Sequence, residues 1–217
     1  MYIPAHFAAP DEEALYAAIE RFSFATLVSP SAKGMVASHL PLLLDRRIPN
    51  DGTPTRSAGA PVPATLLGHT ARANSQWREA AGQEVLAIFA GPHAYISPQW
   101  YEADKVVPTW NYVAVHAYGR LELIDDPTEA EALLRRTVAF YESSRPQPWA
   151  LNEPREFVER LTSQIVAFRI PIARLEGKWK LNQNHPAERR QKVIAALEQQ
   201  GDENSREIAS LMKSRVG

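Results

Sequence analysis

Residues 109–124 read TWNYVAVHAYGRLELI, and this stretch decides the fold. Side chains of an extended chain alternate between two faces, so Tyr112 and Tyr118 fall on one face and Val113 on the other. Both faces carry bulky side chains. The stretch therefore predicts a long strand that is covered on both sides, as in the wall of a barrel.

Further apolar stretches predict more strands than helices. The strands are expected at 24–30, 35–44, 64–70, 84–91 and 164–177, and the helices at 11–22, 71–82, 125–144, 153–163 and from residue 186 onward. Turns join most consecutive strands, which disfavours a doubly wound parallel sheet. We expect a mainly β protein of the α+β class, an antiparallel β-barrel with peripheral helices.

Two connecting segments and the end of the chain have their own patterns. Residues 31–34 predict a turn, and residues 45–63, rich in Pro, Gly, Ser and Thr, predict an exposed loop. Asp126 is placed to cap a helix that has Pro127 as its first residue. Residues 201–217 predict a loosely packed helix or a frayed tail.

Charge and cysteine content exclude several classes of function. The chain has 217 residues, with 24 Lys and Arg, 25 Asp and Glu, and a formal net charge of -1. A protein-wide field that attracts nucleic acid is absent, so any basic patch must be local. There is no cysteine, which excludes disulfides, thiolate metal sites and cysteine nucleophiles.

The start of the chain and the lack of long apolar runs set the expected location. Residues 1–15 have neither the basic start nor the apolar run of a signal peptide. No stretch approaches the roughly 20 apolar residues of a membrane-spanning helix. We expect a cytoplasmic protein with no membrane partner.

Residues 66–77, LLGHTARANSQW, are the first candidate site. An apolar strand ends at Gly-His-Thr and enters a helix, whose first amide groups and dipole favour an anion. Arg72 adds a fork that suits phosphate oxygens, and His69 and Asn74 can donate further hydrogen bonds. The alternative interpretation is an arginine on a solvated helix and a histidine at the end of a strand.

Residues 36–44 offer a second candidate. Pro41 cannot donate to a ladder of strands, which places Ser38 and His39 at a sheet edge or a bulge. Bulges tend to lie beside binding sites. The alternative is an irregular sheet edge at which the hydrogen bonds of His39 are satisfied.

A polar trio enters the long strand at residues 109–111. Trp110, between Thr109 and Asn111, can line a flat heteroaromatic ligand. Packing of the tryptophan in the core is the equally favoured alternative.

Residues 174–191, RLEGKWKLNQNHPAERRQ, carry the most unusual pattern of charge. Lys178 and Lys180 alternate about Trp179, so both ammonium groups fall on one strand face. Adjacent cations repel each other unless an anion lies between them, which favours a phosphate or carboxylate partner. The basic residues after 185 are interpreted as the solvated face of a helix.

No residue is predicted to be catalytic or to bind a metal. The six histidines lack the spacing of metal ligands, and no Gly-x-Ser-x-Gly, Gly-x-Gly-x-x-Gly or Walker sequence occurs. Nicotinamide and nucleotide triphosphate sites of those kinds are not indicated.

Six blocks in one order resemble the PaiB family of FMN-binding negative transcriptional regulators. They are MYIPAHF (1–7), HLPLLL (39–44), LLGHTARANSQW (66–77), AIFAGPHAYISPQWY (87–101), VVPTWNYVAVHAYG (106–119) and RLEGKWKLNQN (174–184). The resemblance implies an FMN-binding split barrel of the pyridoxamine-phosphate-oxidase-like kind over residues 1–184, followed by a C-terminal helical extension, 185–217. It also implies a homodimer with the flavin at the subunit interface.

The resemblance implies a set of FMN-binding residues by motif position. They are Ser38, His39, Leu40 and Pro41 along the ring, His69, Thr70, Ala71, Arg72 and Asn74 at the phosphate, Thr109, Trp110 and Asn111 at the ring or ribityl chain, and Lys178, Lys180 and Gln183 from either subunit. The chain departs from the family in a longer, proline-rich loop at 46–63 and in Asn182, where a serine is common.

The implied function is negative regulation of transcription, in which the flavin or its redox state alters the dimer. The alternative is an FMN-dependent oxidoreductase acting on a small molecule, since the fold supports both. A repressor that binds DNA directly is a third class, and the net charge of -1 and the lack of a clear helix-turn-helix weigh against it. Haem also binds among split-barrel relatives.

Overall fold

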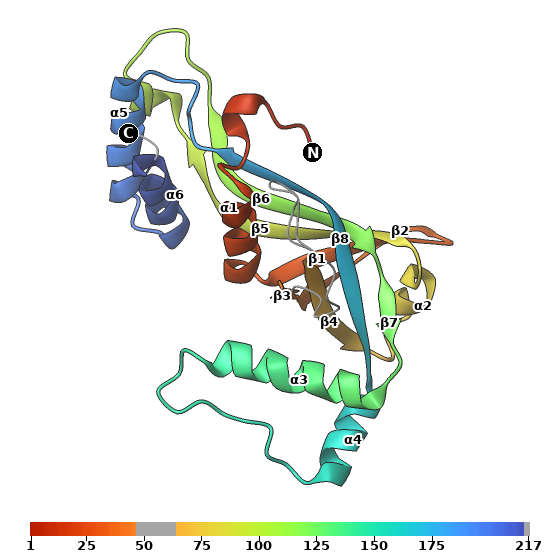
Figure 1. Cartoon of the computed structure of the whole chain (residues 1–217). Coiled ribbons are helices and arrows are strands. Elements are labelled where there is room, and N and C mark those ends of the chain that lie inside the picture. Colours follow the sequence, from red (N-terminus) through yellow and green to blue (C-terminus); the bar gives the residue numbers. More distant parts are fainter. Residues whose placement is uncertain (47–63, 215–217) are drawn as a thin grey trace, which may run out of the picture. The chain divides into compact units, whose positions relative to one another are not determined.

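The computed structural model describes residues 1–46 and 64–214 (Figure 1). Its strands are β1 (Phe24–Ser31), β2 (Gly34–Pro41), β3 (Leu43–Asp45), β4 (Thr65–Ala71), β5 (Glu84–Ile96), β6 (Thr109–Arg120), β7 (Glu122–Ile124) and β8 (Ile165–Lys180). Its helices are η1 (Ala5–Phe7), α1 (Glu12–Arg21), α2 (Gln76–Ala80), η2 (Pro98–Tyr101), α3 (Pro127–Glu142), α4 (Arg155–Ser163), α5 (Ala187–Gln199) and α6 (Glu203–Lys213). Residues 47–63 of the predicted loop lie outside the described residues.

The strands form one sheet in the order β2-β1-β5-β6-β8-β4-β3, with β7 paired to β8. The pairs β1–β2, β1–β5, β3–β4, β4–β8 and β7–β8 are antiparallel. The predicted antiparallel, mainly β architecture is therefore confirmed. The predicted turn at 31–34 is confirmed as well, because Ser31 pairs with Gly34 across the β1–β2 hairpin.

The chain divides into two compact units. Unit 1 comprises Met1–Ala18, Phe89–His116 and Glu176–Gly217, and unit 2 comprises Ile19–Ile88 and Ala117–Leu175. The predicted division into residues 1–184 and 185–217 stays a prediction.

The long strand predicted at 109–124 is confirmed as β6, with a break near its end. Buried Val113 and Val115 alternate with half-buried side chains, so both faces are covered. The ladder stops at Leu121, whose amide donates to the carbonyl of Gln83 (3.0 Å) and whose carbonyl accepts from the amide of Gly82 (2.8 Å). After these two hydrogen bonds of Leu121, the chain is extended again as β7.

In unit 2, α3 begins as the sequence predicts. The Asp126 side chain accepts a hydrogen bond from the amide of Thr128 (2.9 Å), and Pro127 is the first helical residue. Ala130 and Leu133 are buried in a cluster with side chains from β7 and β8. The cap and this apolar stripe together fix where α3 leaves the sheet.

In unit 1, the two C-terminal helices lie side by side (Figure 1). The prediction of a loosely packed or frayed end is wrong for α6. Ile208 and Met212 are one helical turn apart and almost fully buried, and Asp202 caps the helix by accepting from the amide of Ser205 (2.9 Å). The polar composition of the segment hid a narrow apolar stripe that is enough to anchor the helix.

Across residues 1–46 and 64–214, no helix is long and apolar enough to span a bilayer.

Removing the Ile208 side chain tests whether α6 is anchored. We expect Ile208→Ala to lower the free energy of unfolding by about 2–5 kcal/mol, because it leaves a cavity at a fully buried position. Chemical denaturation measures the effect, with Ser210→Ala on the exposed side of α6 as the control. Equal stabilities of the two variants would show that α6 is not packed as described.

Candidate functional site

The segment after β4 in unit 2 differs from the expected helix start. The helix predicted at 71–82 is shortened to α2, five residues long, and a turn precedes it. Three amide groups of this start already have acceptors: Arg72 N donates to Gln164 O (2.8 Å), Asn74 N to Ala71 O (2.9 Å) and Gln76 N to Asn74 Oδ1 (3.0 Å). An anion at this position would therefore depend on the arginine side chain rather than on a helix terminus.

The Arg72 side chain lies across the junction of α4 and β8. Its Nε donates to the carbonyl of Ser163 (2.8 Å) and its Nη2 to the carbonyl of Ile165 (2.7 Å). The Trp77 indole in turn donates to the Arg72 carbonyl (3.1 Å). Both acceptors of the guanidinium are neutral main-chain oxygens, so its positive charge is not cancelled by either of them.

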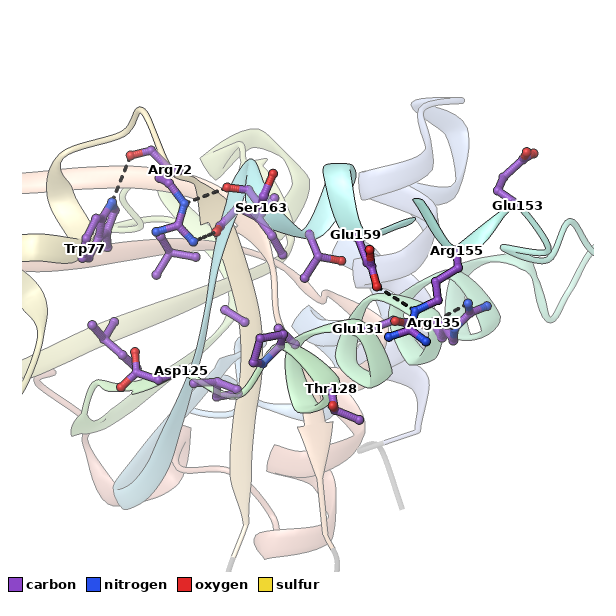
Figure 2. Close-up of a pocket in the computed structure, with 18 residues that line it drawn as sticks. Arg72, Trp77, Asp125, Thr128, Glu131, Arg135, Glu153, Arg155, Glu159 and Ser163 are labelled. Carbon is purple, nitrogen blue, oxygen red and sulfur yellow. Dashed lines mark hydrogen bonds and ion pairs between the residues drawn. The ribbon is translucent and has the colours of Figure 1, made fainter. Parts of the chain in front are cut away.

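Arg72 lines a pocket of about 850 Å³ in unit 2 (Figure 2). The other cations of its wall are paired with carboxylates: Arg135 Nη2 lies 2.8 Å from Glu131 and Arg155 Nε lies 2.7 Å from Glu159. Apolar residues of β7 and β8 also line this pocket. Of the three arginines that line the pocket, Arg72 is the one held by carbonyl oxygens and not by a carboxylate.

The predicted β2 residues lie on an edge strand, as the proline in this segment requires. The Ser38 hydroxyl accepts from Asn74 Nδ2 (2.9 Å), which ties β2 to the turn after β4. His39 Nδ1 lies 3.0 Å from the Thr26 hydroxyl, and its ring stacks on Phe24 with centroids 6.5 Å apart. Leu40 is buried and Pro41 ends the strand.

Gln76 is a buried residue that sequence reasoning missed. Its Nε2 contacts three acceptors of the β1–β2 hairpin: Ser29 Oγ (3.0 Å), Leu27 O (3.2 Å) and Val36 O (3.3 Å). Because its amide also bonds Asn74, Gln76 joins the hairpin to the turn that carries Arg72. The available signal was its spacing to Ala80, one turn later, which puts both on the buried face of α2.

His69 and Thr70 lie on β4 within unit 2. Burial lowers the pKa of His69 below the ordinary histidine value, and its Nδ1 has no hydrogen-bond partner in the described part of the chain. The imidazole is therefore neutral near pH 7, and its buried Nδ1 is left without a hydrogen bond to the described residues. Thr70 lines a small apolar recess with Leu27 and Leu40.

In unit 1, the two predicted lysines have different surroundings. Lys178 is 9% exposed, donates to the carbonyl of Tyr2 (3.1 Å) and has the Tyr112 ring centroid 5.4 Å away. Lys180 is half-buried and donates to the Thr109 hydroxyl. Burial and the neighbouring charge of Lys178 lower the pKa of Lys180, in agreement with the expected shared face.

In the predicted trio Thr109, Trp110 and Asn111 at the start of β6, Asn111 is buried and Trp110 is exposed. Asn111 is fully buried, and its Nδ2 contacts the thioether of Met212 on α6 (3.4 Å). Trp110 is 52% exposed and lies against Tyr95, with ring centroids 5.8 Å apart. Trp110 is therefore the member of the trio that a flat ligand can reach.

The turn after β8 holds Gln183 and Asn182, the residue at which the chain departs from the serine common in the family. Gln183 bonds within its own turn, accepting from the amide of Leu181 (2.7 Å) and donating to the carbonyl of Trp179 (2.5 Å). Asn182 has a φ of 61° and donates to the Tyr101 hydroxyl (3.0 Å). Asparagine adopts this left-handed conformation more readily than most residues, which gives the departure a structural reason.

Comparison with solved structures identifies the class of protein. The flavocytochrome Anf3 from Azotobacter vinelandii matches with a TM-score of 0.56 at 14% identity, over 82% of this chain and 72% of that one. An FAD and heme binding protein from Mycobacterium smegmatis matches with a TM-score of 0.55 at 13% identity, over 79% and 72%. At this identity the likeness shows the fold, which is the flavin-binding split barrel.

Sequence relatives identify the family within this class. Residues 1–174 match the family described as "Putative FMN-binding domain". The chain is 33% identical over 221 residues to "Protease synthase and sporulation protein PAI 2" of Bacillus subtilis, covering 100% of this chain and 98% of that protein. An uncharacterised protein of Aspergillus fumigatus is 35% identical over 226 residues, covering 86% and 85%. The chain belongs to this FMN-binding, PaiB-like family, and its cofactor is FMN.

The pH dependence of stability tests the surroundings of His69. Its pKa is lowered by burial from an ordinary value of 6.5, so below that pH the unfolded chain binds more protons than the folded one. We expect the free energy of unfolding to fall as the pH drops below about 6.5, and His69→Gln to fall less steeply. Denaturation of the flavin-free protein at several pH values measures this, with exposed His6→Gln as the control. An unchanged pH profile in His69→Gln would contradict the assignment.

Proposed function

We propose that the protein is an FMN-binding negative regulator of transcription that holds its flavin at a homodimer interface. The observation that carries the proposal is the 33% identity to the Bacillus subtilis protein over the full length of both chains. The name of that relative connects it with protease synthesis and sporulation, which supports a regulatory role. A cytoplasmic location accords with that role.

In unit 2, we propose that Arg72 contacts the FMN phosphate, with His69, Thr70, Ala71 and Asn74 around it. Arg72 fits a phosphate because the acceptors of its side chain among the described residues are neutral carbonyl oxygens and because it lines a pocket. Ser38, His39, Leu40 and Pro41 are proposed to follow the flavin. The hydrogen bond from Asn74 to Ser38 supports this grouping.

In unit 1, we propose that Trp110 contacts the isoalloxazine ring. Its exposed indole beside Tyr95 suits a planar heteroaromatic group. Thr109 and Asn111 are proposed to support it, and Lys178, Lys180 and Gln183 remain proposed contacts from either subunit. When bound, the flavin supplies redox chemistry, and these side chains bind and shield it.

Exposed apolar side chains in unit 2 support a homodimer. Phe24 and Met35 are 68% and 69% exposed, and both lie on the hairpin whose outer strand, β2, is a sheet edge. Large apolar groups on an open edge favour pairing with another chain. A second copy of this chain is the proposed partner.

Comparing FMN with riboflavin tests the phosphate site. We expect Arg72→Gln to weaken FMN binding about 10- to 100-fold, the worth of a charge-assisted hydrogen bond, while riboflavin, which lacks the phosphate, binds equally to both proteins. Quenching of flavin fluorescence measures both affinities, with Arg78→Gln on α2 as the control. An equal loss for both flavins would mean that Arg72 acts through the fold and not through the phosphate.

Selection of bound DNA fragments from a genomic pool tests the regulatory role. We expect the protein to retain specific fragments. Salt should weaken this binding, because the protein contacts DNA phosphates. Adding FMN to the flavin-free protein should change which fragments are retained or how tightly they bind. Light scattering of the same samples reports the dimer. Steady oxidation of NAD(P)H by an added acceptor, with no fragment selected, would favour the alternative of an FMN-dependent oxidoreductase. An absorbance spectrum distinguishes flavin from haem in the purified protein.

A further inference from the structure

Three consecutive carbonyl groups hold Arg72 at the junction of α4 and β8. Ser163 O accepts from Arg72 Nε (2.8 Å), Gln164 O from the Arg72 amide (2.8 Å) and Ile165 O from Arg72 Nη2 (2.7 Å). Main chain and side chain of one residue are thus fixed by one short segment. Figure 2 shows the side chain reaching across to Ser163.

The bonded atoms lie along one side of the guanidinium group. Nε and Nη2 form the side edge of the plane, while Nη1 and the second hydrogen of Nη2 form its end edge. Within the described residues, both hydrogen bonds of this side chain use the side edge. The end edge has the two parallel donors that bind a phosphate in bidentate fashion.

We infer that the junction Ser163–Gln164–Ile165 is a positioning element for the phosphate subsite, which aims the end edge of Arg72 at the 5′-phosphate of the flavin. The inference rests on the proposed function, because it takes the phosphate to be the anion at Arg72. The three residues act through their carbonyl oxygens. Because the main chain does this work, no motif of side chains marks these residues.

The position of the junction at the end of a helix strengthens this role. Ser163 is the last residue of α4, where the helix dipole favours a cation. α4 is nine residues long and has one fully buried side chain, Val158. A helix this short depends on its tertiary contacts, so the aim of Arg72 depends on α4 being folded. Phosphate binding and the folding of α4 must then stabilise each other.

Loosening α4 without touching Arg72 tests the inference. We expect Val158→Ala to weaken FMN binding about fivefold or more, the lower end of typical coupling between sites, and to leave riboflavin affinity unchanged. Val193→Ala is the matched control, because Val193 is an equally buried valine on α5 of unit 1. A purely structural role of α4 would not distinguish the two flavins.

Hydrogen exchange tests the reciprocal effect in the unaltered full chain. With FMN at about a hundred times its Kd, amides at 155–165 are expected to exchange up to about a hundredfold more slowly, and those of α5 to change little. If FMN binds but exchange at 155–165 is unchanged, and both valine variants bind FMN alike, the positioning role is overturned and the proposed function stands. If the unaltered protein binds no FMN at micromolar concentration, the proposed function falls, and the inference falls with it.

Discussion

The pairing of β8 with neighbours on both of its edges is the interaction on which the rest of the structure depends. β8 is sixteen residues long and pairs with β4 and β7, and it lies between β6 and β4 in the sheet. A strand with partners on both sides has its backbone groups satisfied by the ladder and cannot slip in register, because a slip would turn every side chain over. This register includes Ile165, which pairs with Ala71 and whose carbonyl accepts from Arg72, so it fixes one side of the Arg72 contact.

In unit 2, the polar side chains of Gln76 and Arg72 are held by main-chain oxygens, whereas other arginines of the unit form ion pairs. Gln76 and Arg72 each collect carbonyl acceptors from a neighbouring element, the first from the β1–β2 hairpin and the second from the α4–β8 junction. Such bonds fix geometry without neutralising charge. This is what an anion subsite requires, since a carboxylate partner would compete with the ligand for the same guanidinium.

Sequence reasoning found the strands because their patterning is local, and β6 and the cap of α3 at Asp126 are examples. It did not find the acceptors of Arg72, because carbonyl oxygens more than ninety residues away carry no sequence signature. The buried role of Gln76 was missed for a similar reason, since its partners are set by tertiary packing. The packing of α6 was underestimated because propensity and polarity say little about a narrow buried stripe. Family resemblance supplied the cofactor, which no residue pattern could name.

The enclosure of Lys178 has a consequence for the chemistry of this surface. Its ammonium group is bounded by the Tyr2 carbonyl and by the rings of Tyr2, Phe7 and Tyr112, which stabilise a cation without an anion. Lys180, two residues on, is less covered and has its pKa lowered by burial and by Lys178. The two neighbours on one strand thus differ in access: Lys178 is buried and Lys180 is half-buried, so an amine-directed reagent would reach Lys180 more readily.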